Sequence, residues 1–142
     1  MRPLRVLVVG AGKLGRQSAR KLVAAGHQPT LVEKDSRIAL EAQHTLGEQV
    51  LHGDGCDPKV LEQAGVARAD VVLALTGDDE DNLVVAELAH RFFGVKCVLA
   101  RVNDPDNECL FRPERGVHSS ISPASIVANL VEQAVDSQAG GP

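Results

Sequence analysis

The sequence lacks the residues on which several common kinds of chemistry depend. It contains no tryptophan and no tyrosine, and aromatic residues make up only 2% of its 142 residues. Without tyrosine, the Tyr-x-x-x-Lys site of short-chain dehydrogenases is excluded. With so few aromatic side chains, the core must consist of Val, Leu, Ile and Ala. Such a core is typical of a buried parallel sheet flanked by helices.

Cysteine and histidine are too few and too scattered for a metal centre or a disulfide framework. The three cysteines, Cys56, Cys97 and Cys109, have no C-x-x-C spacing, which indicates free thiols in a reducing compartment. His52 lies close to Cys56, but two further ligands at useful spacing are missing. No histidine has a supporting acid at a spacing that suggests nucleophilic or acid–base catalysis. We therefore expect no metal and no catalytic residue.

Long hydrophobic runs and excess positive charge are also missing. No segment approaches the roughly 20 apolar residues of a membrane span, and the first apolar run is too short for a signal peptide. The net charge of −4 gives no reason to expect nucleic acid or an anionic membrane as a partner. We expect a cytoplasmic protein without direct membrane insertion.

Strand and helix patterns alternate along the chain. Strands are expected at 5–9, 29–33, 49–54, 69–76, 96–102 and 117–122. Helices are expected at 13–25, 36–46 with Ser36 as N-cap, 57–65 with Asp57 as N-cap, 79–93 and 123–136, with a helix or turn at 105–112. The fold class is therefore α/β. Residues 1–137 are predicted to form one doubly wound Rossmann domain, with a mostly parallel six-stranded sheet and helices on both faces, and 138–142 a flexible tail.

The stretch VVGAGKLGRQ, at residues 8–17, contains the spacing Gly10-x-Gly12-x-x-Gly15 of a dinucleotide-binding loop. In such a loop the first glycine makes the tight turn, the second clears space for the pyrophosphate, and the third lets the helix pack against the strand. Residues 1–32 contain basic residues but no Asp or Glu, so positive charge surrounds the loop. We expect the phosphates of a nucleotide to bind here, at Gly10, Ala11, Gly12, Lys13, Leu14 and Gly15.

Two residues near this loop bear on the choice of nucleotide. Glu33 ends the second expected strand, where a carboxylate accepts hydrogen bonds from an adenosine ribose and repels a 2′-phosphate; Lys34 beside it weakens that repulsion. Lys13 lies inside the loop and could reach the second or third phosphate of a polyphosphate. The alternatives are an exposed strand-end charge for Glu33 and a first-turn helix lysine for Lys13.

Later strand ends add further candidate contacts. Asp54, between Gly53 and Gly55, either accepts a hydrogen bond from the adenine amino group or braces its loop. Thr76 and Gly77 follow the fourth strand and would border the rest of the ligand, while Asp78 to Asp81 suit the start of the next helix. Arg101 lies in an otherwise apolar strand and needs a partner, either a phosphate or a carboxylate of a partner subunit.

Nucleotide binding without a catalytic constellation favours a protein that binds a nucleotide without doing chemistry on it over an enzyme. The alternative is the cofactor domain of an NAD-dependent oxidoreductase that lacks its catalytic domain, because 142 residues leave no length for a substrate domain. A redox-sensing transcriptional regulator is disfavoured because no basic DNA-reading helix is visible. The sequence does not choose between NAD(H) and ATP/ADP.

The chain resembles the nucleotide-binding N-terminal domain of TrkA and KtrA proteins, the RCK domains that regulate bacterial potassium uptake systems and channels. The resemblance covers about Leu4 to Gln133. It is carried by VVGAGKLGRQSARKL, by Glu33, by LHGDGCDPKVLEQAGVARADVVLALTGDDEDN and by LARVNDPD. Its most specific part is the middle block, with the T-x-x-D-x-x-N pattern at Thr76, Asp79 and Asn82.

The resemblance implies a Rossmann domain that binds NAD(H), ATP or ADP without catalysis. It implies homodimers, possible assembly into a ring at the cytoplasmic face of an integral membrane potassium transporter subunit, and gating by conformational change. In the family, residues matching Lys13 and Arg101 look toward phosphates, Glu33 matches the ribose acid, and Asp54 lies by the adenosine. Members often have an acid at the position of Ala124, near an intersubunit cation site, and carry a second C-terminal domain that is absent from these 142 residues.

Overall fold

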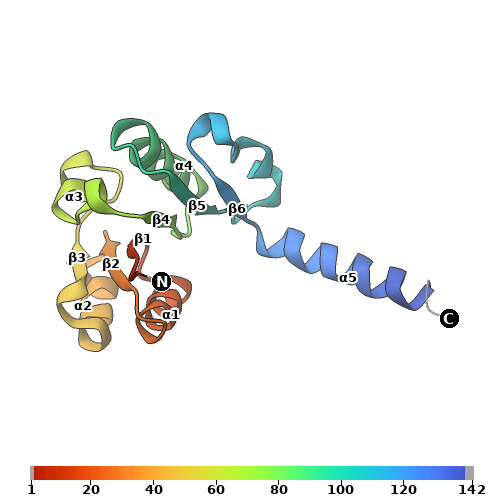
Figure 1. The fold of residues 1–142 in the computed structure, drawn as a ribbon, viewed down its shortest axis with the longest axis horizontal. Helices are drawn as coiled ribbons and strands as arrows, with labels where there is room; N and C mark the ends of the chain where they lie inside the picture. Colours follow the sequence, from red (N-terminus) through yellow and green to blue (C-terminus); the bar gives the residue numbers. More distant parts are fainter. Residues whose placement is uncertain (1, 140–142) are drawn as a thin grey trace.

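The computed structural model describes residues 2–139, and its centre is a six-stranded sheet in the order β3-β2-β1-β4-β5-β6 (Figure 1). Every strand pair is parallel, so the expectation of a mostly parallel sheet is confirmed, and the sheet is in fact entirely parallel. The strands are β1 (Arg5–Val9), β2 (Gln28–Glu33), β3 (Val50–His52), β4 (Val71–Ala74), β5 (Cys97–Arg101) and β6 (Ser119–Ile121). The helices are α1 (Lys13–Ala24), α2 (Ser36–Leu46), α3 (Pro58–Gln63), α4 (Asp79–Glu87) and α5 (Pro123–Ala139).

Helices cover both faces of the sheet, as the Rossmann prediction requires. On one face, α1 and α2 pack over β1, β2 and β3, around a core that includes Val6, Val8 and Leu31. On the other face, α3 and α4 pack over a larger core that includes Leu7 and Val72. Adjacent strand residues point to opposite faces, so near-continuous Val and Leu runs bury both sides of the sheet.

Short connecting helices account for several differences from the expected elements. The third and fourth strands are shorter than predicted at both ends. The first residue expected in the third strand belongs to η1 (Gly47–Gln49), and η2 (Val66–Arg68) precedes β4. The helix expected over 79–93 is α4 continued by one π-helical segment, η3 (Leu88–Phe92). The segment expected as a helix or turn is η4 (Pro105–Leu110), followed by η5 (Pro113–Arg115).

Aspartates cap the helices that follow β2, β3 and β4. The side chain of Asp35 accepts hydrogen bonds from the backbone N–H groups of Arg37 and Ile38, so Asp35 caps α2 and the prediction of Ser36 was wrong. Either residue type can cap, and the helix begins one residue earlier than the cap choice implied. Asp57 caps α3, with Pro58 in its first turn, as predicted.

Helix α5 does not return to the sheet but projects away from it (Figure 1). It runs to Ala139, so residues 138 and 139, predicted to begin a flexible tail, are helical; residues 140–142 lie outside the described residues. Its apolar side chains are exposed, at Ile126, Val127, Leu130, Val131 and Val135. Across residues 2–139, no helix is both long enough and apolar enough to span a membrane.

The departure of α5 leaves part of one sheet face uncovered. On the side of α1 and α2, the β5 and β6 residues Cys97, Leu99, Arg101 and Ile121 are only half-buried. On the opposite side, the β5 residues Val98 and Ala100 are buried beneath α4. The uncovered face adjoins the carboxyl end of β5, where Arg101 lies.

Candidate functional site

A cavity of about 480 Å³ lies at the carboxyl edge of the sheet, above the ends of β1, β2 and β4. From β1 the chain builds the sheet outward through β2 and β3, and then crosses back to continue from β4 to β6 on the other side. The cavity therefore lies at the topological switch point, where doubly wound sheets bind ligands.

Most of the candidate residues from the sequence lie around this one cavity. The lining includes Gly10, Gly12, Lys13, Leu14, Glu33, Lys34, Asp54, Gly55, Thr76, Gly77 and Arg101. Three other candidates do not line it, namely Ala11, Gly15 and Gly53. Ala11 is buried beneath the loop, Gly15 packs on the loop backbone, and Gly53 packs against Val60. These three residues shape the site without facing its interior.

The three glycines of the loop have separable structural roles. Gly10 has a φ of 107°, and an added Cβ would lie 2.9 Å from the carbonyl group of Leu75. A Cβ at Gly15 would overlap the carbonyl oxygen of Gly10, so helix and loop can meet closely only at glycine. A Cβ at Gly12 would meet nothing within 4 Å, because Gly12 faces the open cavity. That open side is where a pyrophosphate would approach the backbone.

The N-terminus of α1 differs from those of α2, α3 and α4. Each of the latter three helices has an aspartate side chain bound to its first N–H groups. Helix α1 begins after Gly12 with no side-chain cap and no acid in its first turn, and its first residue is the exposed Lys13. The positive end of α1 and Lys13 thus border the cavity together, an arrangement that suits a bound anion.

Glu33 connects the end of β2 to the glycine loop. Its Oε1 accepts a hydrogen bond from the backbone N–H of Ala11 at 2.8 Å, and its Oε2 accepts one from the N–H of Asp35 at 2.9 Å. The carboxylate is therefore fixed at the rim of the cavity and also holds the loop. Each oxygen retains acceptor capacity for a ribose hydroxyl.

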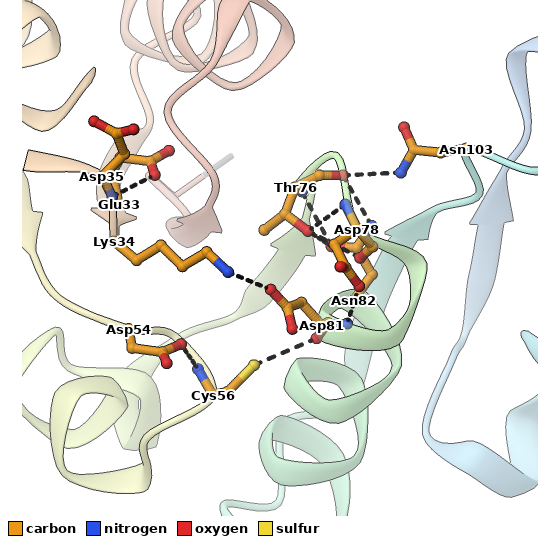
Figure 2. Close-up of polar contacts among 10 residues, drawn as sticks. All are labelled: Glu33, Lys34, Asp35, Asp54, Cys56, Thr76, Asp78, Asp81, Asn82 and Asn103. Carbon is orange, nitrogen blue, oxygen red and sulfur yellow. Dashed lines mark hydrogen bonds and ion pairs between the residues drawn. The ribbon is translucent and has the colours of Figure 1, made fainter. Parts of the chain in front are cut away.

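An ion pair crosses the cavity beside Glu33. The Nζ of Lys34, at the end of β2, lies 2.9 Å from Oδ2 of Asp81 in the first turn of α4 (Figure 2). The Cys56 thiol donates a weak hydrogen bond to the backbone oxygen of Asp81, while Asp54 accepts from the N–H of Cys56. Partial burial, assisted by Asp81 and Asp54, raises the pKa of Cys56 to about 12, so its thiol stays protonated and unreactive.

Asn82 joins the two strand ends on the other side of the cavity. It is fully buried, and its Oδ1 accepts hydrogen bonds from the N–H and the hydroxyl of Thr76 (Figure 2). Its Nδ2 donates to the backbone oxygens of Thr76 and Arg101. One amide therefore fixes the end of β4 relative to the end of β5.

Arg101 ends β5 at the cavity with part of its guanidinium unsatisfied. Within residues 2–139, its Nε is the buried side-chain polar atom that has no hydrogen-bond partner. A buried, unpaired guanidinium nitrogen is costly, so an anionic partner is expected at this position.

Asp79 organises the loop that follows β5. Its carboxylate accepts from the backbone N–H groups of Asn103 and Asp104 and from the side chains of Asn103 and Asn107. Partial burial acts to raise the pKa of Asp79, but these hydrogen bonds outweigh it and the pKa is lowered. Asp78, rather than Asp79, caps α4.

Sequence reasoning missed part of the cavity wall. Apolar side chains complete it at Val9, Val32, Ile38, Leu75 and Val85, and polar ones at Asp35, Cys56, Asp78 and Asp81. Val9, Val32 and Leu75 lie at or next to strand ends and Ile38 lies in the first turn of α2, positions at a switch point that could have indicated them; Val85, farther along α4, carries no such signal. Among the described residues, no group of three or more His, Cys, Asp and Glu side chains is placed to hold a metal ion.

Comparison with known proteins identifies relatives of this chain. The model of the TrkA-N domain matches residues 6–123. The Trk system potassium uptake protein TrkA of Mycobacterium tuberculosis strain H37Rv is 42% identical over 137 residues, which cover 93% of this chain and 60% of the relative. A TrkA homologue of Methanothermobacter thermautotrophicus is 35% identical over 130 residues, 92% of this chain and 59% of the relative. The chain thus spans less than two thirds of the length of these relatives.

Solved structures share the fold at lower sequence identity. The TrkA-N domain of the inner membrane protein ybaL from Escherichia coli has a TM-score of 0.80 and 17% identity, covering 94% of this chain and 97% of that one. The GsuK channel bound to NAD has a TM-score of 0.73 and 23% identity, covering 84% and 21%. GsuK bound to ADP has a TM-score of 0.75 and 21% identity, covering 95% and 34%.

Proposed function

Because this chain belongs to the TrkA-N domain family, we propose that it is a nucleotide-sensing regulatory domain of a potassium uptake system or channel. The relatives named above are potassium uptake proteins, and the glycine loop, Lys13 and Arg101 that line the cavity would suit the phosphates of a nucleotide. We assign it no catalytic role. Its action would be to change shape on binding a ligand and to pass that change to a membrane partner.

The observation that carries this proposal is the buried, unpaired Nε of Arg101, a residue that lines the cavity. Gly12 with its open face, the uncapped start of α1 and Lys13 line the same cavity. A phosphate chain between them would supply the charge that each of these groups lacks. Glu33 would then accept hydrogen bonds from the ribose hydroxyls, and Asp54 would lie near the adenine.

The ligand that we propose is an adenine nucleotide, either NAD(H) or ATP/ADP. The solved relatives bound to NAD and to ADP support this class. Lys13 and Arg101 suit the extra charge of a polyphosphate, whereas the glycine spacing suits a dinucleotide. A bound phosphate would also neutralise Arg101 and thereby stabilise the end of β5, from which the chain continues to β6 and α5.

Helix α5 and the uncovered sheet face support the proposal of a homodimer. The exposed apolar side of α5 and the half-buried residues of β5 and β6 are both surfaces that a second copy could cover. Such a dimer would place α5 of one protomer against the other, close to Arg101. We propose that these dimers, or a larger ring of them, act at the cytoplasmic face of the membrane beside an integral potassium transporter subunit.

Calorimetric titration with NAD, NADH, ATP, ADP and AMP in turn tests the proposed function. We expect at least one of them to bind with a dissociation constant below about 1 mM. Glu33→Ala should weaken that binding about tenfold or more, because it removes the ribose acceptor. Glu62→Ala, an exposed carboxylate on α3, is the matched control and should bind normally. If none of the five ligands binds, the proposal fails.

A second measurement separates a sensor from an oxidoreductase. Bound NADH should not be oxidised by an added acceptor above the rate of a protein-free control. Sustained turnover that Glu33→Ala abolishes would overturn the regulatory assignment and favour the alternative, a cofactor domain that requires a catalytic partner.

A further inference from the structure

Lys34 occupies the position at which a cation would change the nucleotide preference of the site. It directly follows Glu33, the residue at the end of β2 that we expect to meet the adenosine ribose. In dinucleotide sites of this fold, a basic side chain near that acid accommodates the 2′-phosphate of NADP. A free ammonium at Lys34 would therefore offset the repulsion that Glu33 exerts on a 2′-phosphate.

The structure directs Lys34 elsewhere. Its side chain extends from the end of β2 across the crevice, and its Nζ ends 2.9 Å from Oδ2 of Asp81 (Figure 2). Glu33 instead turns toward the glycine loop, where its carboxylate binds the N–H groups of Ala11 and Asp35. The ribose acid and the neighbouring ammonium thus diverge, and the ammonium is bound to another carboxylate.

Asp81 is the more firmly held member of this pair. Its backbone N–H donates to Oδ1 of Asp78 at 3.0 Å, and its backbone oxygen accepts from the thiol of Cys56. Its side chain is 26% exposed, against 58% for Lys34. A long, exposed lysine side chain has many conformations in solution, so the position of Asp81 in α4 determines where the Lys34 ammonium lies.

The surrounding charge reinforces this arrangement. Hydrogen bonding and Coulomb attraction to Asp81 raise the pKa of Lys34, with further attraction from Asp54 and Asp78. These three carboxylates all line the cavity on the side of α3 and α4. Lys34 is therefore engaged by carboxylates, and a 2′-phosphate beside Glu33 would meet no free ammonium from Lys34.

We infer that Asp81 is a positioning residue for nucleotide specificity: by holding Lys34, it strengthens the preference of the site for adenine nucleotides with a free ribose 2′-hydroxyl. This inference rests on the proposed nucleotide-binding function. Asp81, in the first turn of α4, would thus influence the choice of ligand through Lys34.

The test compares ligands that differ only in the 2′-phosphate. Dissociation constants are measured by calorimetry for NAD and NADP, and for AMP and adenosine 2′,5′-bisphosphate, on the full 142-residue chain. In Asp81→Asn we expect the preference for the 2′-hydroxyl ligand to fall about three- to fivefold, the range expected for an exposed ion pair. The affinity for NAD or AMP should stay within about twofold.

Three variants show whether Asp81 acts through Lys34. Asp81→Glu should restore the wild-type preference, because it keeps the ion pair. In the double variant Lys34→Met/Asp81→Asn the preference for the 2′-hydroxyl ligand should no longer fall, because no ammonium is left to meet the 2′-phosphate. Glu80→Gln removes an exposed charge from the same turn without touching the cavity and should leave the preference unchanged.

The outcomes separate this inference from the proposed function. An unchanged preference in Asp81→Asn would overturn the inference. An equal fall in this preference in the double variant or in Glu80→Gln would also overturn it, since the loss of a negative charge alone would then explain the change. Failure of the wild-type chain to bind any of the ligands, with or without a 2′-phosphate, would instead overturn nucleotide binding itself.

Discussion

Asn82 and Arg101 are joined by a hydrogen bond between the first turns of α4 and the last residue of β5: Nδ2 of Asn82 donates to the backbone oxygen of Arg101 at 2.9 Å. The same amide binds Thr76 at the end of β4 through both its oxygen and its nitrogen. Two neighbouring strand ends, both at the cavity, are thus held at a fixed separation by one buried side chain.

Asn82→Ala should therefore destabilise the protein and disturb the cavity. It leaves the N–H of Thr76 and the oxygen of Arg101 without their buried partner, which we expect to cost about 2–4 kcal/mol. Urea unfolding followed by circular dichroism measures the loss. Asn129→Ala, at an exposed position on α5, should change the stability by less than about 0.5 kcal/mol. Equal effects at the two positions would contradict the bridging role of Asn82.

The glycine loop allows stability and ligand binding to be changed separately. Gly12→Ala should leave the free energy of unfolding within about 0.5 kcal/mol of wild type, because the added methyl meets no atom within 4 Å. The same methyl would occupy the approach of the phosphates, so nucleotide affinity should fall about tenfold or more.

Gly10→Ala provides the opposite case. Its positive φ and the approach of the new Cβ to the carbonyl of Leu75 should cost about 2 kcal/mol or more in stability. Thermal unfolding and nucleotide titration of both variants make the comparison. A stable Gly12→Ala that binds nucleotide as well as wild type would remove the loop from the site.

The sequence predicts the sheet better than it predicts the cavity. Short, near-continuous apolar runs alternate along the chain with helical patterns that end at glycine. This order indicates a doubly wound fold, because a parallel sheet covered by helices buries both faces of its strands. Contacts across the crevice are different, since Lys34 and Asp81 are 47 residues apart and meet only because β2 and β4, the strand that precedes α4, both lie beside β1. No local pattern encodes such a pair. Asn82 belonged to a recognisable pattern, but its burial and its bonds to two strand ends depend on the packed structure.

Arg101→Met should weaken nucleotide binding without a loss of stability. The substitution removes a buried guanidinium nitrogen that has no partner, so the free protein should be unchanged or more stable by up to about 1 kcal/mol. Loss of a charged contact to a phosphate should lower nucleotide affinity by about ten- to a hundredfold. Urea unfolding without ligand measures the change in the free energy of unfolding, and calorimetry with ligand measures the change in affinity. A large loss of stability would show instead that Arg101 has a structural role.

The pair of Asp70 and Arg2 should make stability depend on pH in acid. The side chain of Arg2, and then the backbone N–H of Arg5, lower the pKa of Asp70 from 3.8 to about 2. Since the folded-state pKa is depressed, the pair contributes stability above the unfolded-state value, and that contribution is lost as pH falls from 3.8 toward about 2.

Asp70→Asn should consequently unfold at lower urea than wild type near neutral pH, and the two proteins should converge near pH 2. Urea midpoints measured between pH 7 and pH 2 follow the convergence. Glu132→Gln, an exposed carboxylate on α5, should track the wild-type curve throughout. If the urea midpoints of Asp70→Asn and wild type still differ by the same amount near pH 2, the lowered pKa of Asp70 is not the source of the difference.

The apolar side of α5 should hold two copies of the chain together. Ile126, Val127, Leu130, Val131 and Val135 follow one another at helical spacing and are all about half exposed or more. Asn129, Glu132, Gln133 and Asp136 lie on the opposite side by the same period. In a single copy the apolar side faces water, which is unfavourable over so many side chains.

Leu130→Asp should therefore convert a dimer into a monomer, because burying a carboxylate in an apolar interface is costly. Analytical ultracentrifugation at micromolar concentrations measures the mass. Asn129→Asp adds the same charge to the polar side of α5 and should leave the dimer intact. A monomeric wild-type protein, or equal dissociation in both variants, would exclude α5 as the contact. A native circular dichroism spectrum of Leu130→Asp would show that the change acts on assembly and not on the fold.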